Sequence, residues 1–126
     1  MKKIKLAISG CMGRMGQELI KSSKKDKSFQ ITVLTENKVI NKKISGVTPD
    51  LNNEQAFRKA DVIIDFTVPK CTMEILKLAT KLRKKIVIGT TGFSKEEEVL
   101  IKNYSKKIPI LKAGNMSLGI NLLMYL

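Results

Sequence analysis

The stretch Gly10-Cys11-Met12-Gly13-Arg14-Met15-Gly16 follows the short apolar run Ile4 to Ile8 and precedes a segment with helical periodicity. A strand, a glycine-rich turn and a helix in this order can hold the pyrophosphate of a dinucleotide. Glycine lets the backbone turn sharply and approach a phosphate without a Cβ in the way, and the first turn of the helix offers unpaired N–H groups. The stretch therefore predicts a cofactor-binding loop, but it does not specify a reaction.

The spacing of the three glycines leaves a second interpretation open. Gly10, Gly13 and Gly16 form Gly-x-x-Gly-x-x-Gly, with Met12 at the position where the commonest dinucleotide fingerprint has its second glycine. A tight turn at the start of a helix is the structural alternative. The place of the loop, between the first strand and the first helix, favours cofactor binding.

Short apolar runs alternate with longer amphipathic segments along the whole chain. This alternation predicts an α/β fold of Rossmann-like type, a doubly wound and mainly parallel sheet with helices on both faces. Five strands are predicted, over residues 4–8, 31–34, 62–66, 86–88 and 108–111. Helices are predicted over residues 15–24 and 71–82, and a third helix begins behind Ser94, where Glu97 completes a capping box. The polar segment 37–53 is predicted to be a loop with at most a short strand or turn.

The composition limits the class of protein. A chain of 126 residues with 43% hydrophobic residues has room for one core of ordinary domain size. The formal net charge of +13 would favour a polyanionic partner, but the positive charge is almost all lysine, spread along the chain in pairs, and aromatic residues do not interleave with it. A solvated lysine surface is therefore favoured over a nucleic-acid interface, and no nucleic-acid partner is expected.

The cysteines and the N-terminus exclude further classes. Cys11 and Cys71 lie far apart in sequence and the chain has no histidine. Neither a zinc site nor a redox dithiol is therefore expected, and no other bound metal is expected. The apolar segment behind Lys3 is interrupted by Lys5, before a signal-peptide core could form, and no stretch approaches the roughly 20 apolar residues that span a bilayer. A cytoplasmic protein without a membrane partner is expected.

An acidic residue lies where a dinucleotide fold needs one. Glu36 follows Gly16 by 20 residues, at the end of the second apolar run, and Asn37 and Lys38 come next. A carboxylate there can accept hydrogen bonds from the adenosine ribose hydroxyls, although a solvent-exposed loop glutamate is the plainer interpretation. The carboxylate disfavours the 2′-phosphate of NADPH while Lys38 can attract it, so NADH and NADPH both stay open.

Three further segments follow predicted strands at the edge where the crevice of such a sheet opens. They are Asp65-Phe66-Thr67-Val68-Pro69, Gly89-Thr90-Thr91-Gly92-Phe93, and the run from Ala113 through Gly114, Asn115, Met116 and Ser117 to Asn121. Their glycines, hydroxyls and amides can contact a nicotinamide carboxamide or a ribose, although ordinary turns use the same residues.

Together these segments resemble one family, the dihydrodipicolinate reductases, also called 4-hydroxy-tetrahydrodipicolinate reductases, of diaminopimelate and lysine biosynthesis. The resemblance covers essentially the whole chain and rests on four motifs in the family's order. These are the glycine loop with its Gly-Arg-Met-Gly ending, Asp65-Phe66-Thr67 with Pro69, Gly89 to Phe93, and Asn115-Met116-Ser117 with Gly119 and Asn121.

The resemblance implies a role for each motif in holding NADH or NADPH. The first loop would hold the pyrophosphate, Glu36 would hold the adenosine ribose with Asn37 beside it, and two later segments would line the nicotinamide. The implied residues of the first loop are Gly10, Cys11, Met12, Gly13, Arg14 and Met15. Those around the nicotinamide are Gly89, Thr90, Thr91, Ala113, Gly114, Asn115 and Met116.

The chain departs from the family in two ways. Many members carry an arginine beside the acidic residue to meet a 2′-phosphate, and Asn37 stands there. Members also continue into a second domain with a histidine pair and a lysine that bind and protonate a cyclic dicarboxylate substrate, and with most of a homotetramer interface. Residues 1–116 are therefore expected to form the dinucleotide-binding domain, and residues 117–126 to begin the helix that leads into the other domain.

Two functions follow from this resemblance. The first is the cofactor-binding half of the reductase, with no catalytic residue and no turnover of its own. The alternative is a catalytically inactive, stand-alone NAD(P)-binding fragment or remnant. A polyanion-binding protein is a more distant third possibility, because only the charge supports it.

Overall fold

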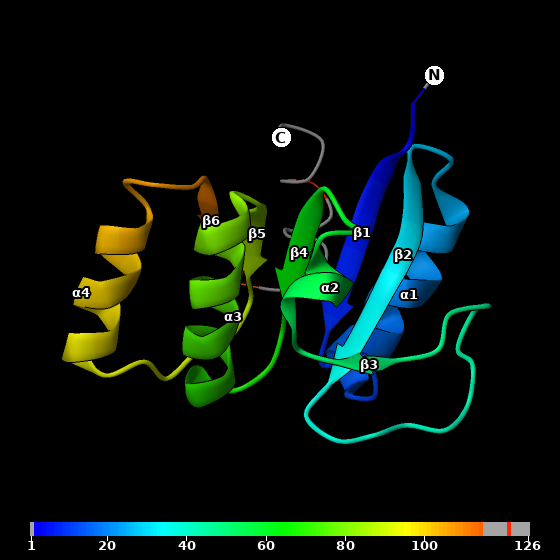
Figure 1. Cartoon of the computed structure of the whole chain (residues 1–126), viewed down its shortest axis with the longest axis horizontal. Helices are drawn as coiled ribbons and strands as arrows, with labels where there is room; N and C mark the ends of the chain where they lie inside the picture. The colour runs from blue at the N-terminus through cyan, green and yellow to red at the C-terminus, as the bar shows by residue number, and fades with distance from the viewer. Residues whose placement is uncertain (1, 115–120, 122–126) are drawn as a thin grey trace.

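The apolar runs form the central strands of the sheet. In β1 (Ile4–Ser9) the residues from Leu6 onward are buried, and in β4 (Val62–Asp65) all the residues are buried. Continuous burial of this kind is typical of parallel strands that are covered on both faces. The computed structural model describes residues 2–114 and residue 121 (Figure 1).

The sheet has the topology of a doubly wound fold. Its strand order is β3-β2-β1-β4-β5-β6, and each neighbouring pair is parallel. The further strands are β2 (Phe29–Glu36), β3 (Asp50–Leu51), β5 (Lys85–Ile88) and β6 (Ile110–Lys112). The order reverses between β1 and β4, and doubly wound sheets bind ligands in the crevice at that point, beyond the carboxyl ends of the strands. The predicted fold class is confirmed.

Helices cover the two faces of the sheet unequally. The helix α1 (Arg14–Lys25) lies on one face. The helices α2 (Glu54–Phe57), α3 (Pro69–Leu82) and α4 (Lys95–Tyr104) lie on the other (Figure 1). Alternate residues of one strand supply the two cores: Leu6 and Ile8 pack with the α1 side, whereas Ala7 packs with the α3 side.

The ends of the helices agree with the sequence. The predicted capping box is present in α4, because the Ser94 hydroxyl accepts from the Glu97 N–H at 3.1 Å and the Glu97 carboxylate accepts from the Ser94 N–H at 2.8 Å. α3 begins at Pro69, whose missing N–H is no loss in the first turn. The predictions for α1, α3 and α4 are therefore confirmed to within a few residues.

The described part of the chain has six strands where five were predicted: β3 is the short strand that the prediction allowed within residues 37–53, and α2 was not predicted. β3 has two residues, Asp50 and Leu51, both exposed, so no apolar run marks it. α2 has four residues, too few to show helical periodicity, and it depends on a cap in which the Asn53 side chain accepts from the Ala56 N–H at 2.8 Å. The helix predicted from Ser117 to Leu126 lies outside the described residues, except for Asn121.

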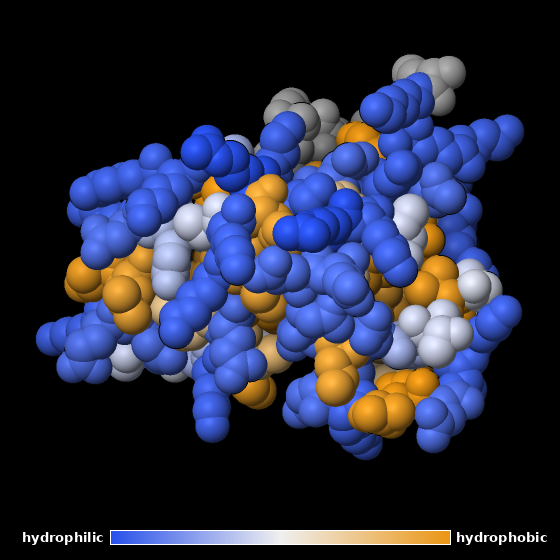
Figure 2. Space-filling view, viewed as in Figure 1, coloured by the Kyte–Doolittle hydropathy of each residue, from blue (hydrophilic) through white to orange (hydrophobic). Residues whose placement is uncertain are grey.

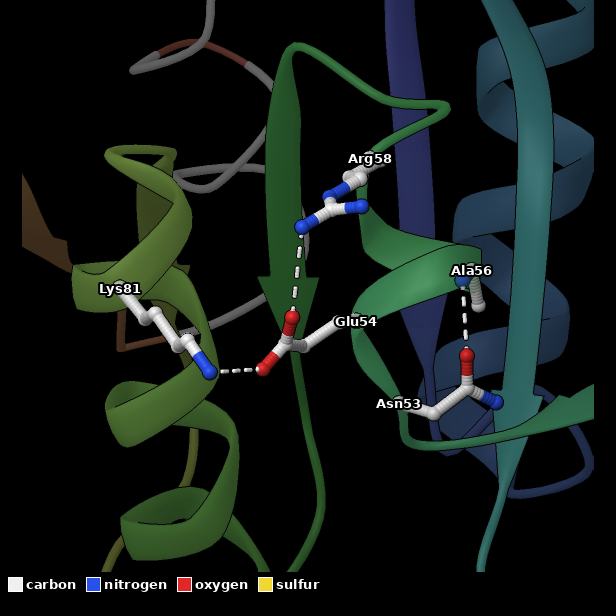
Figure 3. A network of polar contacts seen from close by, with 5 residues as sticks. All are labelled: Asn53, Glu54, Ala56, Arg58 and Lys81. Carbon is white, nitrogen blue, oxygen red and sulfur yellow. Dashed lines mark hydrogen bonds and ion pairs between the residues drawn. The ribbon is translucent and has the colours of Figure 1, made fainter.

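A small network of charged side chains joins α2 to α3. Figure 3 shows the Glu54 carboxylate between Lys81 of α3 and Arg58, with Nζ of Lys81 2.5 Å and Nη2 of Arg58 3.4 Å from its two oxygens. The hydrogen bond from Lys81 is the main reason that the pKa of Glu54 lies below its usual value. Because the side chains are partly exposed to water, the network should stabilise the fold only slightly.

Replacing Glu54 with glutamine tests this network through its pH dependence. A lowered pKa in the folded state stabilises the fold above the ordinary carboxyl pKa of 4.5, and this contribution is lost as the pH falls through the lowered pKa. We therefore expect Glu54→Gln to lower the Tm by about 2 °C at pH 7 and by less at pH 3. In a chain that already carries Glu54→Gln, Lys81→Met should lower the Tm no further. An equal loss of Tm at both pH values would show that the contribution of Glu54 to stability does not come from its charge.

The surface agrees with the high net charge. Figure 2 shows hydrophilic side chains over most of the visible face, with smaller hydrophobic areas between them. Within the part of the chain that the structure describes, no helix is both long and apolar enough to cross a bilayer.

Candidate functional site

The glycine loop is a tight turn that is anchored to the neighbouring strand. The N–H groups of Gly10 and Cys11 both donate to the Thr35 carbonyl of β2, at 3.0 and 3.2 Å. Gly10 has a φ of +80°, and a Cβ there would lie 2.9 Å from the Phe66 carbonyl oxygen. The loop therefore needs glycine at position 10 both for its backbone conformation and for its approach to the chain after β4.

Gly16 is required for the packing of α1 on this loop. It is buried in the first turn of α1, and a Cβ there would overlap the carbonyl oxygen of Gly10. The helix can start this close to the loop only because the side chain is absent. This is the role that the third glycine of a dinucleotide fingerprint has in close packing.

Gly13 differs from the other two glycines because the protein itself does not require it. Its φ is −73°, an ordinary value, and a Cβ there would meet only the Gly10 carbonyl oxygen, at 3.4 Å. The residue is exposed and lies at the N-terminus of α1. A ligand that approaches the backbone at this point would explain why the position carries no side chain.

The N-terminus of α1 is suited to an anion. Its first N–H groups have no partner within the helix, as at any helix start, and no side chain caps them. The first turn also has no acidic residue. The positive end of the helix dipole and the uncapped N–H groups of the first turn therefore favour an anion at this end of α1.

Glu36, at the end of β2, binds the backbone of the glycine loop. Its Oε2 accepts from the Met12 N–H and its Oε1 accepts from the Asn37 N–H, both at 3.0 Å. Each carboxylate oxygen keeps further acceptor capacity for a hydroxyl group. The structure thus places Glu36 beside the loop, as a ribose-binding residue would have to lie.

These elements border a cavity of about 240 Å³ at the switch point between β1 and β4. Four of the predicted residues line it: Gly10, Gly13, Glu36 and Asn37. The structure therefore brings together the predicted pyrophosphate loop and the predicted ribose-binding residues.

The other predicted loop residues differ in how far their side chains are exposed. Cys11 is fully buried, so only its backbone can meet a ligand, and the partly buried Met12 packs against the core on the α1 side. Burial and the nearby Glu36 charge raise the pKa of the Cys11 thiol to about 11, which excludes it as a nucleophile at neutral pH. Arg14 is exposed, and Met15 is half-buried.

The segments after β4 and β5 interlock at the far side of this cavity. The Thr67 N–H donates to the Thr90 hydroxyl at 2.9 Å. The Phe66 ring occupies the space where a Cβ of Gly89 would be, so Gly89 is a packing requirement. Thr91, beside them, is exposed.

The last predicted segment reaches the same edge of the sheet through β6. The Ala113 N–H donates to the Ile88 carbonyl of β5 at 2.8 Å, and Ala113 is buried while Gly114 is exposed. Asn115 and Met116 lie outside the described residues, so their predicted role stays a prediction.

The sequence missed part of the lining. Ser9, Asn52 and Cys71 also border the cavity, and the Ser9 hydroxyl donates to the Asn52 side-chain oxygen at 3.2 Å. Asn52 lies in the polar segment without periodicity, so no sequence signal marked it. Thr67 and Val68, which also line the cavity, belong to a motif that the sequence did mark at the end of a strand. Among the described residues, no group of three or more acidic or cysteine side chains could hold a metal ion.

The strand order, the glycine turn at the switch point and the carboxylate at the end of β2 define a Rossmann-like domain of the dinucleotide-binding type. Comparison with known proteins then identifies the family. Residues 4–116 match the family described as dihydrodipicolinate reductase, N-terminus, and the chain belongs to this family.

Relatives with high similarity carry one name. The chain is 71% identical over 126 residues to a 4-hydroxy-tetrahydrodipicolinate reductase of Pelagibacter ubique (strain HTCC1062), with all of this chain and 49% of that protein covered. It is 42% identical over 123 residues to the protein of the same name from Bdellovibrio bacteriovorus, with 98% and 49% covered. The chain thus spans about half the length of the curated relatives it matches.

Solved structures agree with the fold. A dipicolinate-bound dihydrodipicolinate reductase from Paenisporosarcina sp. TG-14 superposes with a TM-score of 0.76 at 27% identity, over 98% of this chain and 51% of that one. A homoserine dehydrogenase from S. aureus superposes with a TM-score of 0.71 at 15% identity, over 90% of this chain and 33% of that one, which shows a shared fold alone.

Proposed function

We propose that this chain is the dinucleotide-binding half of a 4-hydroxy-tetrahydrodipicolinate reductase. The proposed reaction is the NADH- or NADPH-dependent reduction of 4-hydroxy-tetrahydrodipicolinate, a cyclic dicarboxylate, to tetrahydrodipicolinate in diaminopimelate and lysine biosynthesis. The family match over residues 4–116 and the 71% identity to a reductase of that name support it. The observation that carries the cofactor assignment is the space beside Gly13. The fold would tolerate a side chain at this position, and a bound pyrophosphate would need the same space.

In this proposal, successive parts of a nicotinamide dinucleotide contact successive segments of the chain. Glu36 would accept hydrogen bonds from the adenosine ribose, and the loop from Gly10 to Met15 with the start of α1 would bind the pyrophosphate. The segments Gly89 to Thr91 and Ala113 to Met116 would line the nicotinamide, which supplies the hydride when it is bound. The protein groups in this chain bind and orient, and the proton donor for the substrate would come from the other half of the enzyme.

The domain organisation and the setting of the protein are part of the same proposal. We infer that residues 1–116 form the dinucleotide-binding domain and that residues 117–126 begin the helix toward a substrate-binding domain. A homotetramer in the cytoplasm, without a nucleic-acid partner, is the expected assembly.

Calorimetry with NADH and NADPH tests the cofactor assignment directly. We expect saturable binding of at least one of them to the 126-residue chain, and negligible reduction of the substrate by this chain alone. Absence of saturable binding of both would overturn the assignment. Binding to unrelated DNA that is stronger than cofactor binding and falls steeply with salt would favour a polyanion-binding protein instead.

Replacing Glu36 with alanine should change the affinities for NADH and NADPH by different factors. The carboxylate can accept from both ribose hydroxyls of NADH, whereas it faces a phosphate in NADPH, so Glu36→Ala should weaken NADH about tenfold and NADPH much less. Titration of each cofactor against the wild type and the variant measures the difference. Glu18→Ala, on the exposed face of α1, is the control that should bind both cofactors as the wild type does. Equal losses for the two cofactors would contradict the ribose role.

A further inference from the structure

A buried carboxylate lies at the carboxyl end of β4, and the proposed function does not use it. The Asp65 side chain has no exposed surface. Its partners are hydroxyl groups, because the Thr67 hydroxyl donates to Oδ1 and the Thr72 hydroxyl donates to Oδ2, each at 2.5 Å. Aspartate is rarely buried to this extent, so its presence at the edge of the crevice needs an explanation.

The cost of burying a charge at position 65 indicates that the carboxylate of Asp65 has a role that an apolar side chain could not have. Burial raises the pKa of Asp65, and the hydrogen bonds from Thr67 and Thr72 oppose that rise. An apolar side chain would occupy the same space without the cost of desolvating a charge. What a carboxylate adds is two oxygens that accept several hydroxyl groups at once.

Thr67, Thr72 and Thr90 come from three different parts of the chain. Thr67 lies in the segment after β4, Thr72 lies in α3, and Thr90 lies in the segment after β5. The Thr90 hydroxyl also accepts from the Thr67 N–H at 2.9 Å, and the Gly89 N–H donates to the Asp65 carbonyl at 2.7 Å. The Asp65 carboxylate therefore holds Thr67, and Thr67 in turn connects the segment that borders the cavity with the segment proposed to line the nicotinamide.

We infer that Asp65 is a positioning residue whose carboxylate holds the segments of Thr67 and Thr90 in register, so that the nicotinamide half of the dinucleotide meets a preformed site. The inference rests on the proposed function, because it assigns a role within that same site. Asp65 has no surface with which to touch the cofactor and acts through the threonines.

The variant Asp65→Asn tests the inference when NADH is compared with ADP. An amide keeps the size of the side chain but offers one acceptor oxygen in place of two. ADP would use the glycine loop and Glu36, which do not depend on the Asp65 carboxylate for their hydrogen bonds. Calorimetry on the full chain should show NADH binding weakened about tenfold and ADP binding changed less than about twofold.

A second pair of variants at Thr72 keeps the inference testable if Asp65→Asn does not fold. Thr72 is fully buried, donates to Asp65 from α3 and does not line the cavity. Thr72→Val removes the donor with little change in shape, whereas Thr72→Ser keeps it. We expect Thr72→Val to weaken NADH about threefold and Thr72→Ser to bind NADH as the wild type does, again with little change for ADP.

The remaining outcomes decide against the inference in different ways. Equal losses of NADH and ADP in Asp65→Asn would assign Asp65 to general stability, and unchanged NADH affinity would show that it positions nothing. Equal NADH affinity of Thr72→Val and Thr72→Ser would also overturn it. A wild-type chain that binds neither NADH nor ADP would overturn the proposed function itself, and with it this inference.

Discussion

Replacing Gly16 with alanine is expected to lower the free energy of unfolding by about 3 kcal/mol or more. The new Cβ would overlap the Gly10 carbonyl oxygen and would lie 2.9 Å from Cα of Cys11. The loop cannot move away cheaply, because the N–H groups of Gly10 and Cys11 are hydrogen-bonded to Thr35 of β2. Urea denaturation followed by circular dichroism measures the loss.

A matched control lies two residues further along α1. Glu18 is exposed, and its ion pair with Lys21 is a long one, 4.0 Å. Glu18→Ala should therefore change the free energy of unfolding by less than about 0.5 kcal/mol. A Gly16→Ala variant as stable as this control would show that the loop and α1 can separate without cost, against the packing described here.

Replacing Gly13 with alanine should have the opposite profile, with little effect on stability and a large effect on binding. The fold has space for the Cβ, so the free energy of unfolding should fall by about 1 kcal/mol or less, the cost of alanine at an N-cap. The methyl group would point where a pyrophosphate has to approach the loop, so NADH binding should weaken at least about tenfold. Calorimetry and urea denaturation on the same preparation measure both quantities.

Binding of ADP provides the internal check on Gly13→Ala. ADP carries the same pyrophosphate, so its affinity should fall by a similar factor, unlike the selective effect expected for Asp65→Asn. NADH and ADP affinities that match the wild type would mean that no dinucleotide approaches the backbone at Gly13. The proposal would then lose its main structural support.

The sequence predicted the parts of the fold that depend on local chemistry. The continuous apolar runs of β1 and β4 and the capping box of Ser94 and Glu97 are local patterns, and each formed the expected element. The glycine loop was also predicted, because its place between a strand and a helix is visible in the sequence. Sequence position alone could not distinguish Gly13 from Gly16, since their different roles depend on what lies within 4 Å of each.

The parts that the sequence missed or located only loosely depend on contacts between distant segments. β3 and α2 are short, and they form because β2 offers a free edge and because Asn53 caps a single turn. Asn52 reaches the cavity because this connection passes beside Ser9. The sequence marked Asp65 as part of a motif, but its burial and its hydrogen bonds to Thr67 and Thr72, which lie in separate segments, required the structure.

The hydrogen bonds of Glu36 have a consequence for the rate at which a ligand binds. Because the Met12 and Asn37 N–H groups already hold the carboxylate in place, the proposed adenosine end of the site is formed before any ligand arrives. A ligand that meets a preformed site does not wait for a rearrangement of the protein. Association of ADP in a stopped-flow instrument should then follow a single phase whose rate rises linearly with concentration.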